Sequence, residues 1–393
     1  MIQVLCIFGT RPEAIKMAPV VWQLRKHPEG FRVRTCATAQ HREMLDQVLD
    51  LFGIVPDVDL DLMQEGQTPS QVASRVLAQL EPVLREERPD WVLVQGDTTT
   101  VMAAAVAAHH LRIRVGHVEA GLRTGDRWNP FPEEMNRVLT DHLSDLCFAP
   151  TERARQNLLR EGLPDARIHV TGNTVVDALL WAANQPPTAE VVELLERLGI
   201  VEETKRRGDP SANSGQRKGT RRDSPPLPVS SAPPLPCSPA PLLLVTAHRR
   251  ESFGQPLERI CQALQEITRQ GNGRVHVVYP VHPNPQVHGP VHRMLGDVPH
   301  ITLLPPVDYL TLVHLMKRST LILTDSGGIQ EEAPSLGVPV LVLREVTERP
   351  EAVEAGVARV VGTATQRIVT ETFRLLDDPQ AYAAMARPVN PYG

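Results

Sequence analysis

The sequence lacks the features of a nucleic-acid-binding or disulfide-stapled protein. Basic and acidic residues nearly balance, at a formal net charge of −5, and are interspersed along the chain, so the sequence predicts no nucleic-acid partner. The five cysteines lie far apart and form no CxxC pair, which argues against a disulfide framework and against a zinc site. We therefore expect reduced, mostly structural thiols.

Long apolar runs and targeting segments are also missing. The apolar opening Ile2 to Phe8 is interrupted by Arg11 and Glu13 too soon for a signal peptide. No run approaches the roughly 20 apolar residues of a membrane-spanning helix. We expect a cytoplasmic protein with no membrane partner.

A dinucleotide-binding fingerprint is absent as well. Gly271 and Gly273 begin the spacing of a GxGxxG motif, but position 276 is His, so a bound NAD is not predicted. The cysteine spacing suggests no metal site either. We expect a protein that works without a cofactor and without a metal.

What the sequence does contain is a regular alternation of short apolar runs and amphipathic stretches. At 393 residues and 41% hydrophobic, the chain is too long for one ordinary core and predicts two domains with a cleft between them. Apolar runs between helical patterns are typical of buried parallel strands, so the predicted fold class is α/β. The predicted strands are Val4–Phe8, Val33–Ala37, Trp91–Val94, Val115–Val118, Leu146–Ala149, Ile168–Thr171, Leu242–Thr246, Val275–Val281, Ile301–Leu304, Leu321–Thr324 and Val338–Leu343.

The pattern divides into a first Rossmann-like domain over residues 1–172, a second over 173–375 and a C-terminal segment over 376–393 that returns toward the first domain. The second domain contains an insertion at about 203–241, rich in basic residues, Ser and Pro and almost free of large apolar side chains. Such a composition cannot bury a core and predicts disorder. A proline-rich docking segment is one interpretation, but a tolerated surface insertion is favoured, and we expect its deletion to leave activity intact.

Chemically unusual residues follow the predicted strands, where ligands bind in open α/β sheets. After the first strand, the sequence GTRPEAIKMAP places Gly9 at a tight turn, Arg11 beside it and Lys16 about one turn into a helix. Arg11 offers a planar fork of donors, and both cations suit a diphosphate. The alternative is that Pro12 and Glu13 simply begin a helix, with both cations in solvent.

Carboxylates follow three later segments of the first half. Asp97 ends WVLVQGD, Glu119 lies in the glycine-rich GHVEAGLRTG, and Glu133 and Glu134 occupy the first helical turn after Pro132. Alone, Asp97 is better explained as a helix N-cap, and acids in a first helical turn are explained by the helix dipole. Together they predict a catalytic cluster, because titratable groups in one cleft can be tuned to acid and base roles.

The second half supplies cations after two of its predicted strands. His248, Arg249 and Arg250 follow one strand, and His282 follows the next. A lone histidine at a strand end is usually structural. Two arginines directly after His248 favour a second interpretation, in which these side chains support a leaving phosphate.

A glycine-rich turn follows a later strand of the second half. The segment TDSGGIQEEAPSLG predicts a strand, a turn at Ser326, Gly327 and Gly328, and a helix that contains Glu331 and Glu332. The glycines allow a phosphate to approach the positive end of the helix, and a carboxylate beyond it can accept both ribose hydroxyls. Tight packing of the glycines without a ligand is the alternative. We expect the second half to hold a nucleotide and the first to present carboxylates to whatever it carries.

These blocks resemble the bacterial non-hydrolysing UDP-N-acetylglucosamine 2-epimerases over nearly the whole chain outside the insertion. The resemblance implies a glycosyltransferase-B fold, in which two Rossmann-like domains face a deep cleft, and a homodimer. It also implies reversible epimerisation at C2 between UDP-N-acetylglucosamine and UDP-N-acetylmannosamine, which supplies units for envelope polysaccharide. The matching segments are FGTRPEAIKMAP, QGDTTT, HVEAGLRTG, FPEEMNR, TGNTVVDAL, TAHRRESFG, YPVHPNP, TDSGGIQEEAPSLGVPVLVLR, TERPEAVEAG and NPYG.

The resemblance further implies a mechanism without a redox cofactor. UDP is eliminated to leave bound 2-acetamidoglucal and is then re-added, with C2 protonated on the opposite face. By motif, the acid and base candidates are Asp97, Glu119 and Glu133, and His248 assists the leaving UDP; which carboxylate serves which face stays open. The implied set for the substrate and its UDP is Arg11, Lys16, Arg249, His282, Ser326, Gly327, Gly328, Glu332 and Arg349.

Members of this family are often activated by their own substrate at a second position. The segment QHREM supplies Gln40 and Arg42 for such an allosteric site. However, Glu43 stands where activated members commonly have glutamine, and Gly66 stands where they can have arginine. Activation by substrate is therefore a hypothesis that Gln40 and Arg42 support and that Glu43 and Gly66 oppose.

The C-terminal end departs from the family pattern. Relatives continue past NPYG into a helix that braces the first domain, so we expect weaker domain closure here. Three other functions are compatible with such a fold: a glycosyltransferase, which needs an acceptor pocket; a hydrolysing epimerase, which releases UDP and free N-acetylmannosamine; and a sensor that binds without turnover. The carboxylate blocks and their full set of candidates favour the epimerase that retains UDP.

Overall fold

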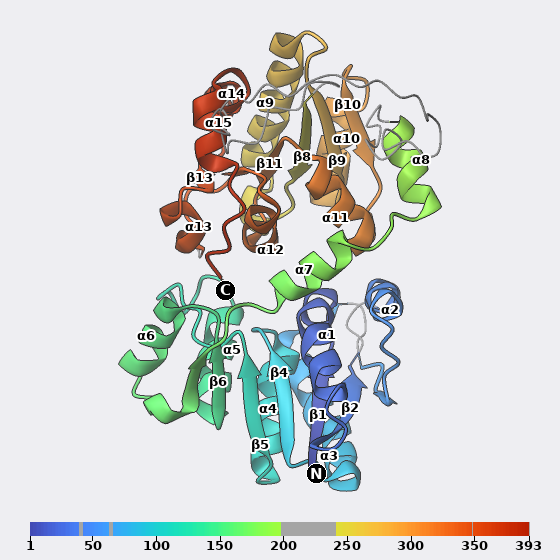
Figure 1. The fold of residues 1–393 in the computed structure, drawn as a ribbon, viewed down its shortest axis with the longest axis vertical. Coiled ribbons are helices and arrows are strands. Elements are labelled where there is room, and N and C mark those ends of the chain that lie inside the picture. The colour runs from blue at the N-terminus through green and yellow to red at the C-terminus, as the bar shows by residue number, and fades with distance from the viewer. Residues whose placement is uncertain (39–41, 63–65, 198–240, 348, 393) are drawn as a thin grey trace, which may run out of the picture.

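The computed structural model describes residues 1–38, 42–62, 66–197, 241–347 and 349–392. Two α/β halves are stacked end to end, with the N-terminus at the far end of the first half and the C-terminus at the junction between them (Figure 1). The insertion predicted at 203–241 lies outside the described residues except for Pro241.

The first half is a seven-stranded parallel sheet in the order β3-β2-β1-β4-β5-β6-β7. The strand order reverses between β1 and β4, which opens a crevice at the carboxyl ends of these strands. The strands are β1 (Ile2–Phe8), β2 (Phe31–Ala37), β3 (Val58–Asp59), β4 (Trp91–Gln95), β5 (Arg114–Val118), β6 (Leu146–Ala149) and β7 (Ile168–Val170). The helices are α1 (Arg11–Arg25), α2 (Arg42–Leu51), α3 (Pro69–Glu87), α4 (Thr99–His110), α5 (Glu133–Leu143) and α6 (Glu152–Arg160).

The second half repeats this plan in a six-stranded parallel sheet of order β10-β9-β8-β11-β12-β13. Its strands are β8 (Leu242–Thr246), β9 (His276–Pro280), β10 (Ile301–Leu304), β11 (Leu321–Thr324), β12 (Val340–Val342) and β13 (Ala358–Val360). Its helices are α8 (Ala189–Arg197), α9 (Gln255–Gly271), α10 (Pro285–Leu295), α11 (Tyr309–Arg318), α12 (Gly327–Glu332), α13 (Pro350–Glu354), α14 (Thr365–Asp377) and α15 (Pro379–Met385). The α/β class predicted from the apolar periodicity is confirmed.

All the predicted strands are present, with ends that differ by a few residues at most. Two short strands were not predicted, β3 and β13. Each spans only two or three residues and lies at the edge of its sheet, so it has no apolar run long enough to distinguish a strand from a loop.

Helix α7 (Val175–Ala183) joins the two halves and packs against both. It contacts α1 of the first half and α11 and α12 of the second. Trp181 of α7 lies 4.8 Å from Trp22 of α1 between ring centroids and 5.2 Å from Phe52, and Phe52 in turn lies 6.1 Å from Tyr309 of α11. These aromatic contacts make the junction part of one continuous hydrophobic core.

The C-terminal segment ends at this junction. After α15, the chain runs to Tyr392, whose side chain is almost fully buried at 1% exposure. The Tyr392 carbonyl accepts a hydrogen bond of 2.6 Å from the backbone N–H of Asn173, just before α7. The Tyr392 hydroxyl accepts from the N–H of Ala352 at 3.3 Å. The last described residues therefore fasten the second half to the connection between the halves.

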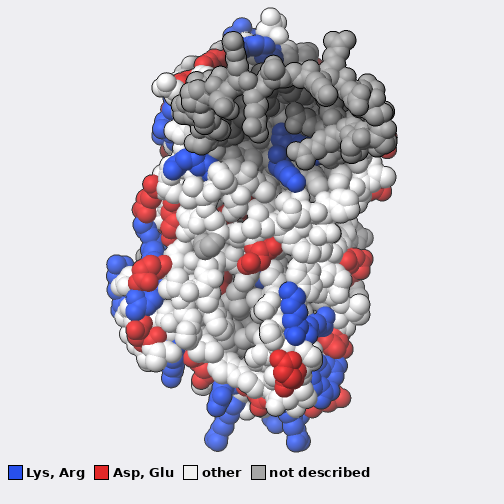
Figure 2. Space-filling view, in the orientation of Figure 1, with Lys and Arg blue, Asp and Glu red and all other residues white. Residues whose placement is uncertain are grey.

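The four cysteines in the described residues are free and buried. Burial raises the pKa of Cys6, Cys36, Cys147 and Cys261 to about 12, as expected for structural thiols. Among the helices that the structure describes, none is both long and apolar enough to span a bilayer. On the face shown in Figure 2, Lys and Arg side chains lie interspersed with Asp and Glu toward the periphery.

Candidate active site

A cavity of about 670 Å³ lies between the two halves, where the carboxyl ends of both sheets face each other. Every residue that the family resemblance implied for catalysis or for binding the substrate and its UDP lines this cavity, whereas Glu134 and Arg250, which the strand-end pattern also suggested, are not among the lining residues. The roles of the implied residues stay predictions, but their common location is a finding. The residues are Arg11, Lys16, Asp97, Glu119, Glu133, His248, Arg249, His282, Ser326, Gly327, Gly328, Glu332 and Arg349.

The start of α1 brings Arg11 and Lys16 to the cavity. Thr10 caps the helix, and the Glu13 carboxylate accepts from the backbone N–H groups of Gly9 at 2.6 Å and Thr10 at 3.2 Å, which completes a capping box. Burial raises the pKa of Glu13 to about 7, even though these hydrogen bonds lower it. The alternative in which both cations are in solvent is wrong, because Arg11 and Lys16 line the cavity and Lys16 is 8% exposed.

Gly9 lies at a point of close packing between the end of β1 and the loop after β2. A Cβ on Gly9 would lie 2.2 Å from the Thr38 hydroxyl oxygen, so a side chain at position 9 would require the Thr38 side chain to move.

A buried cluster of two cations and two carboxylates crosses between the halves. The Lys16 ammonium contacts the Glu119 carboxylate of the first half and lies 3.2 Å from Glu331 Oε2 of the second. Arg349 pairs with Glu331, and its Nη2 lies 3.9 Å from Glu119 Oε1. Gln95 Nε2 donates to Glu119 Oε2 at 3.1 Å. The carboxylate of Glu119 is thus surrounded by donors before any ligand binds.

The charges in this cluster stabilise one another. Burial by itself lowers the pKa of Lys16, but Glu119 and Glu331 outweigh that effect, so the pKa lies above its usual value. Burial likewise raises the pKa of Glu331, yet Arg349 and Lys16 more than offset it, so the pKa lies below its usual value. Lys16 and Glu331 therefore stay charged at neutral pH despite their burial.

The backbone at Glu119 has a conformation that residues other than glycine rarely adopt. Its φ is +69°, in the left-handed region, and such residues concentrate at functional sites. The N–H groups of Glu119 and Ala120 both donate to the Phe148 carbonyl of β6, at 3.0 and 3.1 Å. Two hydrogen bonds to the neighbouring strand therefore hold the turn that directs Glu119 toward the cavity.

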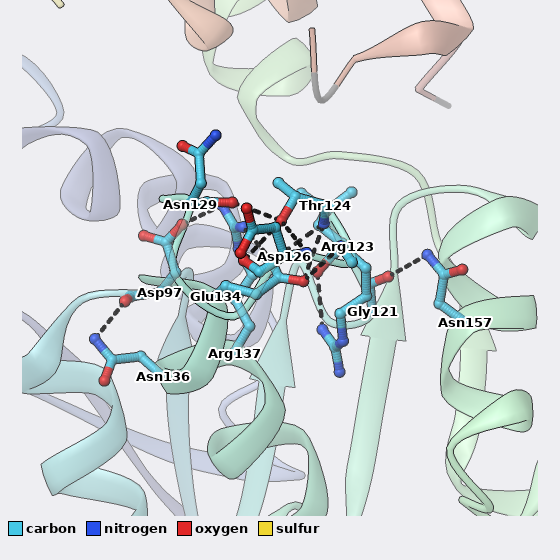
Figure 3. Close-up of polar contacts among 12 residues, drawn as sticks. Asp97, Gly121, Arg123, Thr124, Asp126, Asn129, Glu134, Asn136, Arg137 and Asn157 are labelled. Carbon is cyan, nitrogen blue, oxygen red and sulfur yellow. Dashed lines mark hydrogen bonds and ion pairs between the residues drawn. The ribbon is translucent and has the colours of Figure 1, made fainter. Parts of the chain in front are cut away.

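Asp97 is held at the cavity by α5. The Arg137 guanidinium pairs with the Asp97 carboxylate, and Asn136 Nδ2 donates to the Asp97 carbonyl at 2.9 Å (Figure 3). The N-cap of α4 is Thr98, whose hydroxyl accepts from the N–H of Val101. The interpretation of Asp97 as the helix N-cap is therefore wrong, and its carboxylate is available to the cavity.

The two adjacent acids that begin α5 have different surroundings. Glu134 is buried and accepts from the N–H groups of Thr124 and Gly125, both at 3.0 Å, while Arg137 donates to it at 3.3 Å (Figure 3). Glu133 lines the cavity. Glu134 thus shapes the loop before α5, and Glu133 is the acid positioned to meet a ligand.

We call the sides of the cavity formed by the first and second halves the first wall and the second wall. His248 and His282 lie face to face on the second wall. Their ring centroids are 5.2 Å apart with an angle of 9° between the planes. Burial, together with His282 and Arg249, lowers the pKa of His248, although Asp325 opposes this. The buried Asp325 accepts from the N–H groups of His248 and Arg249, both at 2.8 Å, and from the Ser252 hydroxyl at 2.9 Å. Asp325 therefore fixes the loop that carries the predicted leaving-group residues.

Glu332 is buried at the same wall. The Tyr309 hydroxyl donates to Glu332 Oε1 at 2.9 Å. Burial raises the pKa of Glu332 to about 7, an effect that Glu331 adds to and the Tyr309 hydrogen bond opposes. Ser326 precedes α12 and makes no side-chain cap hydrogen bond with it. This wall therefore contains a carboxyl whose pKa is raised to about 7 and a histidine whose pKa is lowered.

Several residues of the site were not predicted. Gln95, Asn173 and Asp325 lie inside the quoted motifs, yet nothing in one sequence distinguishes a supporting side chain from its neighbours. Glu331 was named beside Glu332 as a carboxylate for a ribose, but its pairing with Lys16 and Arg349 was not predicted. Arg137 was recognisable in principle, because it lies one helical turn beyond Glu133 and Glu134, where a cation pairs with an acid.

The candidate allosteric residues cannot be placed. Gln40 lies outside the described residues, and of Arg42 the structure describes only that it begins α2. Activation by substrate stays a prediction. In the described ranges, no group of three or more His, Cys, Asp or Glu side chains is arranged to hold a metal ion.

The sequence is similar to one family of known proteins. It matches the model of a family described as UDP-N-acetylglucosamine 2-epimerase over residues 23–206 and 229–393. It is 53% identical to the UDP-N-acetylglucosamine 2-epimerase of Salmonella typhimurium over 393 residues, which cover 100% of this chain and 95% of that protein.

Solved structures agree with the sequence match. The UDP-GlcNAc 2-epimerase of Neisseria meningitidis, in a crystal structure bound to UDP-GlcNAc, superimposes with a TM-score of 0.86 at 42% identity, covering 100% of this chain and 96% of that one. That of Methanocaldococcus jannaschii, in complex with UDP-GlcNAc and UDP, superimposes with a TM-score of 0.78 at 32% identity, with the same coverage. The predicted two-domain, glycosyltransferase-B-like fold is confirmed.

Proposed function

The chain belongs to the UDP-N-acetylglucosamine 2-epimerase family of enzymes, and on that premise we propose that it interconverts UDP-N-acetylglucosamine and UDP-N-acetylmannosamine by inverting C2. One observation supports the proposal above all. A single cavity is lined by carboxylates from the first half and by cations and a serine–glycine turn from the second. Such a cavity can hold a sugar against one wall and its diphosphate against the other.

The reaction proceeds by elimination and re-addition. The C2 proton of the sugar is not acidic, so the anomeric C–O bond breaks as a carboxylate removes that proton, which gives UDP and 2-acetamidoglucal. UDP then re-adds at C1 while C2 receives a proton on the opposite face. Each direction needs a base on one face and an acid on the other, and Asp97, Glu119 and Glu133 are the groups that line the cavity for these tasks.

The second wall stabilises the departing UDP. His248 and Arg249 belong to one loop, and the buried carboxylate of Asp325 fixes that loop through its backbone. Burial lowers the pKa of His248. The negative charge of the leaving diphosphate opposes that shift and favours the protonated imidazole, which stabilises the charge on the departing UDP.

The remaining second-wall residues hold the nucleotide itself. Ser326, Gly327 and Gly328 bind the phosphates, and Glu332 accepts the ribose hydroxyls. Arg11 extends from the first half to the second, and its Nη1 donates to the Val307 carbonyl of the second half at 3.2 Å. Substrate binding therefore draws on both halves and favours their closed arrangement.

The resemblance to the family also supports a wider context for this reaction. The enzyme acts as a homodimer in the cytoplasm and supplies N-acetylmannosamine units for envelope polysaccharide. Light scattering on the purified chain tests the first of these points. A mass of one chain at micromolar concentration would contradict the dimer.

Product analysis tests the reaction. The purified chain is incubated with UDP-N-acetylglucosamine in D2O, and the C1 and C2 protons are followed by NMR. We expect UDP-N-acetylmannosamine with deuterium at C2. Accumulation of UDP and free N-acetylmannosamine would replace the proposal with a hydrolysing epimerase, and binding without any product would replace it with a sensor.

A further inference from the structure

Asn173 lies between two carboxylates that come from different halves. Its Nδ2 is 3.3 Å from Glu119 Oε2 of the first half and 3.2 Å from Glu331 Oε2 of the second. Asn173 is 6% exposed and is not among the residues that line the cavity. It is thus a neutral donor placed behind the site, where two negative charges approach each other.

The orientation of this amide is fixed by its other contacts. Asn173 Oδ1 accepts from the backbone N–H of Val175 at 3.1 Å, at the first residue of α7. A backbone N–H can only donate, so the amide oxygen must face Val175 and the NH2 group must face the carboxylates. The backbone N–H of Asn173 is held in turn by the Tyr392 carbonyl.

The donors around Glu119 are distributed unevenly between its two oxygens. Lys16, Gln95 and Asn173 all donate to Oε2. Oε1 lies 3.9 Å from Arg349 Nη2. Hydrogen bonds to a carboxylate oxygen make it a weaker proton acceptor, so Oε1 is the oxygen better suited to exchange a proton with a substrate.

We propose that Asn173 is a positioning residue, which turns Oε1 of Glu119 toward the sugar and holds the two halves in register by bonding one carboxylate from each. The inference rests on the proposed function, since it assigns Asn173 a part in that reaction. Its basis is the placement of one buried amide at the connection between the halves, with both N–H donors used in bridging them. A purely structural cap on α7 would need only the amide oxygen.

Asn173→Asp separates the positioning role from a purely structural cap on α7. Aspartate keeps the acceptor for the Val175 N–H but replaces the NH2 donor with a negative charge. We expect kcat to fall about 100-fold, the scale of a misplaced catalytic group, and the Kd for UDP to change less than about threefold. The added charge raises the pKa of a neighbouring base, so the acidic limb of the kcat/KM profile should move to higher pH by roughly one unit.

Two further variants complete the test. Asn173→Ser keeps a capping oxygen, removes the NH2 group and adds no charge, so kcat should fall about 10-fold with no movement of the acidic limb. Asn184→Asp makes the same chemical change at the exposed end of α7, where Asn184 Nδ2 donates to the Leu180 carbonyl at 2.8 Å. This control should keep kcat within about twofold and leave the pH profile in place.

The readouts distinguish failure of this inference from failure of the proposed function. If the wild type forms UDP-N-acetylmannosamine and Asn173→Asp keeps its kcat and its acidic limb, the Asn173 assignment alone is overturned. If the wild type does not turn over, amide hydrogen exchange of the UDP-bound wild type and Asn173→Asp tests whether Asn173 bridges the halves. Lower protection of both the 116–121 and 325–332 segments in Asn173→Asp supports the bridging role, and unchanged protection overturns it.

Discussion

The two walls of the cavity differ in how their charged groups are satisfied before a ligand arrives. On the first wall, Glu119 and Asp97 already have cationic partners, Lys16 and Arg137. On the second wall, Arg349 is likewise paired, with Glu331, but burial raises the pKa of Glu332 to about 7 and lowers that of His248, so these two groups are pushed toward their neutral forms.

This difference separates preorganised chemistry from ligand-dependent binding. A carboxylate held by fixed donors needs little reorganisation when it exchanges a proton with a substrate. Burial lowers the pKa of His248 and a nearby diphosphate raises it, so the charge of the second wall depends on its ligand. The first wall is therefore expected to control kcat, and the second to control nucleotide affinity and its pH dependence.

The largest effect is expected at the first wall. Glu119→Gln retains the size and most hydrogen bonds of the side chain but cannot take up a proton, so kcat should fall by about 10²–10⁴. The Kd for UDP should stay within about threefold, because the second wall is unchanged. Steady-state kinetics and calorimetry measure the two values. A large loss of UDP affinity with a normal kcat would break the division between the walls.

An intermediate effect is expected from pH at the second wall. Ribose hydroxyls donate to an ionised Glu332, so the contribution of Glu332 to UDP affinity should fall as pH falls below about 7, by up to about tenfold per unit. Glu332→Gln should bind UDP more weakly at pH 8 and show a flatter profile. Glu13, His248 and the ligand titrate alike in both proteins, so the difference between the two profiles isolates Glu332. Identical profiles of UDP affinity against pH in the two proteins would mean that Glu332 does not bind the ribose.

The same carboxyl affects stability with a definite sign. Its folded pKa of about 7 exceeds the ordinary 4.5, so the folded protein binds more protons in this range. The contribution of Glu332 to stability therefore falls as pH rises from about 4.5 to 7. Between pH 5 and 7, the Tm of the wild type should fall relative to that of Glu332→Gln, as thermal unfolding can show. An equal or larger decrease in the variant would contradict the raised pKa.

The smallest effect is expected at the junction outside both walls. Tyr392→Phe removes the hydroxyl that accepts from Ala352 and donates to the Arg349 carbonyl at 3.4 Å, which should lower stability by about 1 kcal/mol. Tyr382→Phe, at a partly buried side chain of α15, is the matched control and should change Tm less. Equal shifts in the two variants would mean that the Tyr392 hydroxyl contributes nothing specific.

The sequence was sufficient for the sheet plan and for the location of the site. Parallel strands are buried on both faces, so apolar runs such as Leu242–Thr246 are recognisable, and the residues after their carboxyl ends must meet at one edge. The motif resemblance then named the family. This is why residues as far apart in sequence as Arg11 and Arg349 were correctly expected in one cavity.

The supporting contacts were not predictable, because neighbouring residues in one motif face different ways. Glu331 turns to Lys16 and Arg349, whereas Glu332 bonds to Tyr309. Thr98 caps α4 where Asp97 was the better candidate by residue type. Side-chain direction of this kind depends on the packing of the two halves, which no local pattern encodes.

The most direct test of elimination and re-addition adds the proposed intermediate to the enzyme. UDP and 2-acetamidoglucal are incubated with the enzyme in D2O, and the sugar nucleotides formed are analysed by NMR. We predict both UDP-N-acetylglucosamine and UDP-N-acetylmannosamine, each with deuterium at C2, because the second wall holds UDP while the first protonates either face of the glucal. Failure to form either product, by enzyme that epimerises UDP-N-acetylglucosamine at its normal rate, would contradict elimination and re-addition in this cavity.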